Sequence, residues 1–130
     1  MTETPGWLND IVRDFAAGLG LKGFALNSDG AAALRFENGT GFRMEYAAGS
    51  LVLSMSVDSP CDPAAAKLLL SAADPLRRDA FAIRACFAGK PLRAVFAVRF
   101  EPADVTLGNL EAAMSGLWRA AENHARRLGA

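Results

Sequence analysis

The chain has 130 residues, and its 14 basic and 14 acidic side chains give a formal net charge of zero. A chain of this length can build one domain around one core, and a neutral balance provides no overall field to collect nucleic acid or an anionic membrane. Hydrophobic residues make up 52% of the sequence, but no run reaches the roughly 18 apolar residues of a membrane span.

The N-terminus and the cysteines indicate where such a domain works. Residues 1–7 contain Glu3 and no basic stretch before an apolar run, so no signal peptide is expected. Cys61 and Cys86 form neither a cluster nor a disulfide framework, which fits a reducing compartment. We therefore expect one cytoplasmic domain that spans residues 1–130.

The first predicted element is an amphipathic helix that opens at Pro5 and Gly6. Its apolar residues recur at helical spacing, and Gly18 and Gly20 supply its C-terminal stop. The stripe consists of Leu8, Ile11, Val12, Phe15 and Leu19. Residues 23–26 then read as a short strand, and the Asn-Ser-Asp-Gly sequence at 27–30 reads as a turn.

Residues 32–57 predict an antiparallel meander of three strands. Apolar and polar residues alternate along 34–37, 42–46 and 51–57, which places one set on each face of a sheet. The connections contain Gly39, Gly41 and Gly49, as tight reversals require. One face of this meander is apolar and must be covered by other elements.

A second helix is predicted to start with Asp62 as N-cap and Pro63 at its first position, and to run to about residue 73. It contains Leu68, Leu69 and Leu70 in succession. Three adjacent positions spread over about 200° of a helix, so a single internal core cannot cover all of them. A second covering surface is therefore expected here.

The rest of the chain predicts a hairpin and a long closing helix. Alternation along 81–87 and 92–100 gives two strands, and the outer side of the second includes Val95 and Ala97, which suggests cover on both sides. Asp104 or Thr106 is expected to cap the final helix. The predicted order is α-β-β-β-β-α-β-β-α, an α+β fold in which three helices flank a twisted antiparallel sheet.

No pattern in the chain predicts catalytic residues, a metal site or a cofactor. Residues 18–23 match G-x-G-x-x-G, but they follow a helix, whereas a dinucleotide site needs this motif at the start of one. His124 is the single histidine, and no ligand set surrounds it in sequence. A hydrolase that uses His124 as base would need a Ser, Cys or Thr brought to it by the fold.

Several segments together resemble a known family, the class I chaperones of bacterial type III secretion, or Tir-chaperone family. The similarity runs from Leu8 to Leu128. It is carried by LNDIVRDFAAGLGL at 8–21, FALNSDG at 24–30, ALRFE at 33–37, FRMEY at 42–46, the break at Pro60, KLLLSAA at 67–73 and the long closing helix.

The resemblance implies a bacterial cytoplasmic homodimer, with heterodimers found among relatives. Such a protein binds the N-terminal region of a secreted effector and keeps it soluble and competent for secretion without ATP. It has no nucleic acid or membrane partner.

Sequence and resemblance together suggest two binding surfaces. We expect the effector at the first helix and first strand, through Trp7, Val12, Leu21, Phe24 and Leu26. We expect the dimer interface at Leu69, Leu70, Val95 and Ala97. The alternative for each residue is ordinary core, because apolar side chains are buried by default. The alternative function is a small apolar-ligand carrier with a cavity between sheet and helix.

Overall fold

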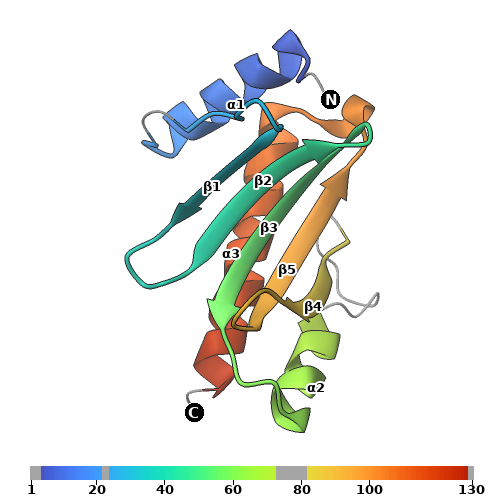
Figure 1. Ribbon diagram of the computed structural model, residues 1–130. Helices are drawn as coiled ribbons and strands as arrows, with labels where there is room; N and C mark the ends of the chain where they lie inside the picture. Colours follow the sequence, from blue (N-terminus) through green and yellow to red (C-terminus); the bar gives the residue numbers. More distant parts are fainter. Residues whose placement is uncertain (1–3, 22–23, 73–81, 129–130) are drawn as a thin grey trace.

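The computed structural model, which describes residues 4–21, 24–72 and 82–128, has three helices and a five-stranded antiparallel sheet (Figure 1). This confirms the predicted fold class. The elements are α1 (Gly6–Gly18), β1 (Ala31–Arg35), β2 (Gly41–Ala47), β3 (Ser50–Asp58), α2 (Pro63–Ala72), β4 (Arg84–Ala88), β5 (Arg93–Phe100), a short 3₁₀ turn (Pro102–Asp104) and α3 (Leu107–Leu128).

The strands are ordered β1-β2-β3-β5-β4, so β1 and β4 form the two edges. The meander β1 to β3 forms as predicted. At the β2–β3 turn, Ala48 and Gly49 have φ values of 53° and 78°. Two successive residues with positive φ are typical of the type I′ turn, whose twist matches that of the flanking strands.

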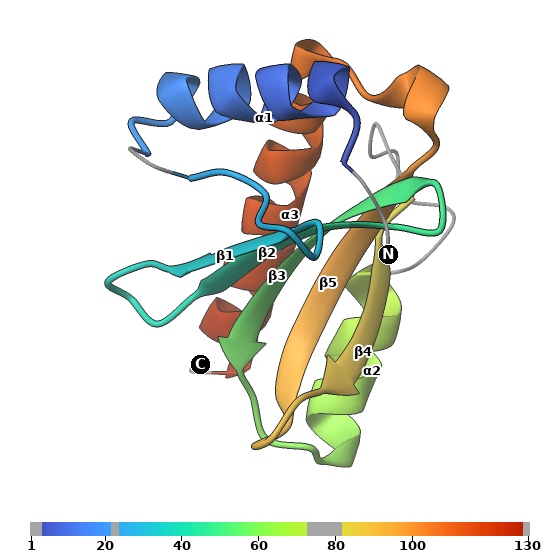
Figure 2. The same ribbon diagram turned by 45° about the horizontal axis from the view of Figure 1, so that its top comes forward.

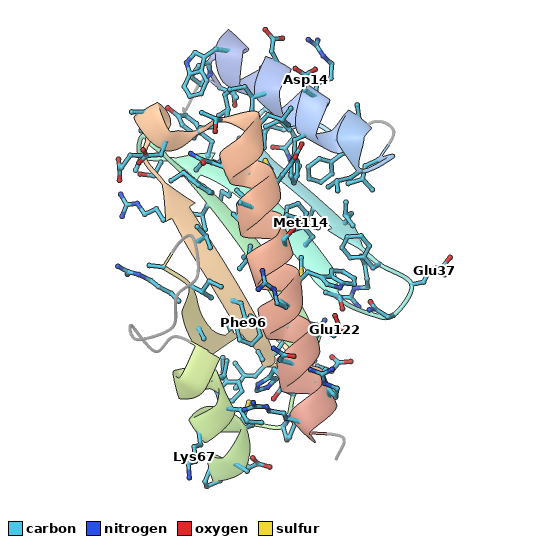
Figure 3. The ribbon with its side chains drawn as sticks, turned by 180° about the vertical axis from the view of Figure 1, so that it is seen from behind. Asp14, Glu37, Lys67, Phe96, Met114 and Glu122 are labelled. Atoms are coloured by element: carbon cyan, nitrogen blue, oxygen red, sulfur yellow. The ribbon has the colours of Figure 1, made fainter. Side chains whose placement is uncertain are left out.

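All three helices lie on one side of the sheet (Figures 2 and 3). The long helix α3 runs across the sheet, α2 lies beside its C-terminal half, and α1 crosses the other end. Alternate side chains of β3 and β5 point toward these helices and are buried: Leu51, Leu53, Met55, Val57, Ala94, Phe96, Val98 and Phe100. At the α1 end, the Phe15 ring packs 6.3 Å from the ring of Phe42.

Two predicted helix caps can be checked directly. The Asp62 Oδ1 accepts a hydrogen bond from the Ala65 N–H at 2.8 Å, so Asp62 caps α2 as expected. At α3, the Thr106 Oγ1 accepts from the Asn109 N–H at 3.1 Å. Of the two candidates for that cap, Thr106 therefore fills the role.

One predicted strand does not form. Residues 24–26 belong to no strand, and the observed order is α-β-β-β-α-β-β-α. The turn after them does form, because the Asn27 Oδ1 accepts the N–H groups of Asp29 and Ala31 at 2.9 and 3.1 Å. Upstream of this turn the Phe24 ring packs 5.9 Å from the Phe42 ring. The segment therefore passes over the core instead of pairing with β1.

The other face of the sheet carries no helix within the described part of the chain (Figures 1 and 3). It presents the alternate residues of each strand, including Val52, Ser54, Val95 and Ala97, which are half-buried by their neighbours. The predicted cover on the outer side of β5 is therefore absent from the described residues. We refer to this surface as the open face.

Candidate functional site

The largest exposed apolar side chains near α1 define the first candidate site. Trp7, in the first turn of α1, is 43% exposed, and Leu19, just after its last turn, is 42% exposed. The apolar spacing placed Leu19 on the buried stripe. Because α1 ends at Gly18, Leu19 becomes the C-cap and falls off that stripe. The glycines on either side of it were the signal for this exposure.

The segment after α1 extends this apolar surface along the helix. The Leu21 N–H bonds to the Ala16 carbonyl at 2.9 Å, which folds the chain back. Gly30, at the far end, lies so near the start of α1 that a Cβ there would come 3.8 Å from the Thr4 Oγ1. Between these points Leu21, Phe24 and Leu26 are half-buried. We call Trp7, Leu19, Leu21, Phe24 and Leu26 the α1 strip.

The α1 strip leads directly into an unpaired sheet edge. β1 follows the turn at 27–30, pairs with β2 on one side, and has no strand on the other within the described residues. An edge strand presents backbone N–H and C=O groups that another chain can pair with. An extended peptide could therefore bury apolar side chains on the strip and add a strand to β1.

Four of the five residues predicted to contact an effector belong to this strip. The fifth, Val12, is 1% exposed and lies in the core beneath the helix. It supports the position of α1 but offers no surface. Whether the other four contact a client remains a prediction.

The residues predicted for a dimer interface do not form one surface. Leu69 is 4% exposed and packs into the core on the helix side of the sheet. Val95 and Ala97 lie on the opposite, open face. Leu70 lies on α2, but its side chain is outside the described residues. Within the run of three leucines, Leu69 is buried and Leu68 is half-buried, so the second covering surface expected here stays a prediction.

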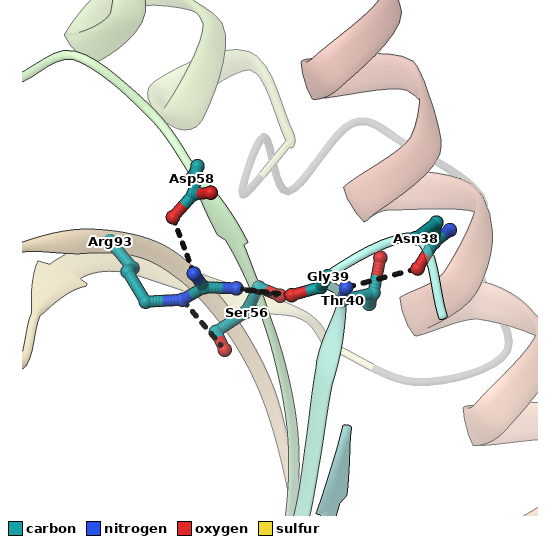
Figure 4. Close-up of polar contacts among 6 residues, drawn as sticks. All are labelled: Asn38, Gly39, Thr40, Ser56, Asp58 and Arg93. Carbon is teal, nitrogen blue, oxygen red and sulfur yellow. Dashed lines mark hydrogen bonds and ion pairs between the residues drawn. The ribbon is translucent and has the colours of Figure 1, made fainter. Parts of the chain in front are cut away.

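The open face is held together by Arg93, whose guanidinium links β5, β3 and the β1–β2 turn (Figure 4). It pairs with the Asp58 carboxylate and donates to the Gly39 carbonyl at 2.8 Å. It also donates to the Ser56 hydroxyl at 3.3 Å and the Ser56 carbonyl at 3.1 Å. This side chain is only 13% exposed, so its role is structural.

The fold does bring a hydroxyl to His124. The Ser59 Oγ lies 2.9 Å from Nε2, and the buried imidazole packs edge-on against Phe96. However, the Ser59 hydroxyl donates its one proton to the Pro60 carbonyl at 3.0 Å. With the hydroxyl proton directed to that carbonyl, Nε2–H donates the shared hydrogen bond and Nδ1 is the unprotonated nitrogen. With the hydroxyl turned toward Nε2, the roles are reversed and Nδ1 carries the proton.

Only the second tautomer would let Nε2 act as a base toward Ser59, and it would bury the Nδ1–H donor without an acceptor among the described residues. Nδ1 is buried, and none of the described carboxylates bonds to it to orient the ring as a catalytic base requires. Burial also lowers the pKa of His124, since the charged imidazolium would lose solvation. The pair anchors the start of the 59–62 loop to α3.

A hollow of about 540 Å³ lies beside α3. Trp118 and Val57 form its apolar part, and Asp58, Glu122 and Arg126 line it as well. Between sheet and α3, the described side chains form a packed core. This arrangement differs from the enclosed, largely apolar cavity that a carrier of small apolar ligands needs.

Comparison with known proteins identifies the fold. No family model matches the chain, and no curated protein matches it significantly. Among solved structures, a chain of the ExsC–ExsE complex is 22% identical with a TM-score of 0.78, and the match covers 96% of both chains. A chain of the HopA1–SchA chaperone–effector complex is 17% identical with a TM-score of 0.69, over 88% of this chain and 89% of that one.

A third match comes from the Yersinia pestis type III secretion chaperone SycH in complex with a fragment of YscM2. It is 16% identical with a TM-score of 0.66, and covers 89% of this chain and 98% of that chain. At these identities the similarity establishes the fold: the chain has the fold of type III secretion chaperones, as the sequence resemblance predicted. In the described part of the chain, no helix is both long and apolar enough to cross a membrane.

Proposed function

We propose that this protein is a type III secretion chaperone that binds the N-terminal region of an effector. The observation that carries this proposal is the α1 strip beside the unpaired edge of β1. An unfolded polypeptide offers what the two features need, namely apolar side chains and free backbone hydrogen-bonding groups. Two structural neighbours support the same role: one is a chaperone–effector complex, and the other is a type III secretion chaperone in complex with a protein fragment.

The proposed role is binding without catalysis or nucleotide hydrolysis. Burial of client side chains on the strip lowers the free energy of the bound state directly, since apolar surface gains about 25 cal/mol for each Å² removed from water. We propose further that the protein acts in the bacterial cytoplasm, where effectors are made, and that two copies associate.

A capture experiment tests the proposal. The chain is tagged at its C-terminus, expressed in its own cell background without added nucleotide, and the proteins that co-purify are identified. We expect one larger protein that is retained through roughly its first hundred residues. A bound lipid or metabolite without any polypeptide would instead support the carrier function, and recovery of the chain alone would contradict the proposal.

Matched variants locate the binding surface. Leu19→Ser and Trp7→Ser remove exposed apolar side chains from the strip, and both should reduce client recovery about tenfold, since each deletes a side chain that the client would bury. Leu92→Ser is the control, because Leu92 is 51% exposed but lies in the β4–β5 connection, away from α1. Equal loss of client in the Leu92 variant would show that binding is not confined to the strip.

A further inference from the structure

The open face of the sheet carries a marked excess of positive charge. Side-chain parity and strand register place seven charged residues of the described strands on this face. They are Arg35, Arg43, Glu45, Asp58, Arg84, Arg93 and Arg99. Five arginines against two carboxylates give the strands +3 on this side, and Glu101, which follows β5 and pairs with Arg99 at 3.6 Å, lowers the excess to +2, although the whole chain has no net charge.

These arginines stand on either side of a shallow groove. Register aligns Arg43 of β2, Ser54 of β3, Ala97 of β5 and Arg84 of β4 in one row across the sheet. Neighbouring strands lie about 4.8 Å apart, so roughly 14 Å separates the two arginine backbones. A hollow of about 570 Å³ opens at the Arg43 end of this row and over the neighbouring row. Arg35, Arg43 and Arg93 line it, with the half-buried Ser54, Ser56 and Val95 among its floor residues, whereas Arg84 and Ala97 lie beyond its lining.

Two of the five arginines are free to bind a ligand. Arg93 is engaged by Asp58, Ser56 and Gly39, and Arg99 donates to the Ser50 hydroxyl at 2.9 Å. The Arg43 guanidinium pairs with Glu45 at 3.3 Å. Arg35 and Arg84 are exposed, and neither makes a hydrogen bond or ion pair with another described residue. They lie on the two edge strands: Arg35 lines the groove from β1, and Arg84 lies on β4 beyond its lining.

We propose that the open face binds an acidic, extended segment of another polypeptide. The guanidinium group binds carboxylates through paired hydrogen bonds, and arginines on both sides of a narrow floor suit a chain with carboxylates on alternate sides. The small residues Ser54, Ser56 and Ala97 allow the backbone of such a segment to approach closely.

Charge argues against the two other occupants of this face. A second copy stacked on it would oppose one +2 surface to another, and like-charge juxtaposition is unfavourable at an interface. A single-stranded nucleic acid would lack stacking partners, because no aromatic side chain belongs to the face among the described strands. The proposal therefore reassigns Val95 from a contact between copies to the groove floor and Ala97 to the surface beside it, and pairing of copies must use another surface.

The acidic-segment site is separate from the proposed client site. The α1 strip lies on the helix side of the sheet and acts through apolar contacts, whereas the open face acts through charge. Variants of one surface leave the other intact, so each proposal can fail without the other. The proposed ligand is an acidic, extended segment of a partner protein. This inference does not depend on the proposed chaperone function.

The experiment measures binding of a fluorescein-labelled peptide of a dozen residues, alternating Glu and Ser, to the full chain by fluorescence anisotropy at low salt. We expect saturable binding that weakens as salt is raised. Arg35→Gln combined with Arg84→Gln should weaken it about tenfold. The matched control combines Arg119→Gln with Arg127→Gln on α3, which removes the same charge from the helix side, and should stay within about twofold of the wild type.

Several outcomes would overturn the inference. These are no binding of the acidic peptide, equal binding of the corresponding Lys and Ser peptide, or equal weakening by the two double variants. Tighter binding of a single-stranded oligonucleotide would assign the face to nucleic acid. A drop in light-scattering mass in the Arg35 and Arg84 variant alone would assign it to a second copy. Circular dichroism of each variant verifies that a loss of binding is not a loss of fold.

Discussion

Arg93 shows how one side chain can join three parts of a sheet at its rim. Its guanidinium bonds to β3 at Ser56 and Asp58 and to the β1–β2 turn at Gly39 (Figure 4). The planar fork of arginine is needed to reach partners in three directions, since lysine offers a single point of donation. Low exposure means that water can replace these bonds only in part.

We therefore expect Arg93→Lys to lower the free energy of unfolding by about 1–3 kcal/mol, because the part-buried acceptors on Ser56 and Gly39 would lose their donor. Chemical denaturation measures this change. Arg35→Lys, on the same face but without such partners, should change stability by less than about 0.5 kcal/mol. Similar losses in both variants would mean that the network does not stabilise the sheet.

His124 predicts a pH dependence of stability. Desolvation by burial puts the pKa of His124 in the folded chain below its ordinary value of 6.5. The unfolded chain then binds more protons in the window below pH 6.5. The contribution of neutral His124 to the stability of the fold is therefore complete above pH 6.5. It decreases as the pH falls toward the lower pKa that His124 has in the folded chain.

Unfolding free energies at pH 7.5 and 5.5 test this sign. The wild type should lose stability on acidification, and His124→Phe, which cannot titrate, should lose less. The aromatic ring keeps the packing against Phe96. An equal or larger loss in the variant would show that other groups dominate this pH range.

At the scale of elements, two glycines in turns allow the cost of a left-handed backbone to be compared with the cost of a steric clash. Gly30 and Gly49 both have φ of 78°, in the left-handed region that favours glycine. A Cβ on Gly30 would lie 2.6 Å from the Tyr46 carbonyl oxygen, whereas nothing lies within 4 Å at Gly49. The pair therefore differs in steric fit alone.

Gly49→Ala should destabilise the protein by about 1–2 kcal/mol, the cost of the left-handed conformation. Gly30→Ala should cost about 1–3 kcal/mol more, since the β2 backbone must move. Thermal or denaturant unfolding of the two variants provides the comparison. Equal destabilisation would mean that the approach of residue 30 to Tyr46 is not tight in solution.

The cap of α2 is a second test at this scale. Asp62→Ala removes the acceptor for the Ala65 N–H and should lower stability by about 1 kcal/mol. Asp62→Asn keeps a side-chain oxygen and should lose clearly less. Denaturant midpoints measure both, and an alanine variant as stable as the asparagine variant would contradict a role for the cap.

The elements illustrate what sequence pattern does and does not report. Asp62 and Thr106 were identified as caps because capping chemistry is local. Residues 24–26 were predicted as a strand because Phe24 and Leu26 alternate with Ala25. Period two indicates that alternate side chains are buried, but it does not indicate that the backbone pairs. Here the burial comes from packing over Phe42, a contact that is not local in sequence.

For the whole molecule, the uneven distribution of charge between the two faces of the sheet predicts that two double variants differ in their retention on a cation-exchange column. The Arg35→Gln, Arg84→Gln variant and the Arg119→Gln, Arg127→Gln variant have the same net charge. A protein turns its most positive patch toward a cation-exchange resin, so loss of charge from the open face should reduce retention more. Elution of both variants at the same salt concentration at pH 7 would show that the face does not dominate the surface field.

Binding surfaces were the part that the sequence could only partly predict. Val12 and Leu69 proved to be core, and Val95 and Ala97 lie across the sheet from Leu69. The identity of an apolar residue does not indicate whether it packs in the core of its own chain or against a partner. The positive charge of the open face could not be predicted from the sequence, because its arginines are far apart along the chain and are brought together only by strand register.

The one-sided cover of the sheet has a consequence for how the chain can change. In β3, Leu51, Leu53 and Met55 pack under α3, whereas Val52, Ser54 and Ser56 between them face outward. Residues that are neighbours in this strand are thus subject to different selection: the inward ones for packing and the outward ones for recognition. A combinatorial library restricted to the outward positions would vary recognition while preserving the core, and the same separation lets a lineage acquire a new partner without refolding.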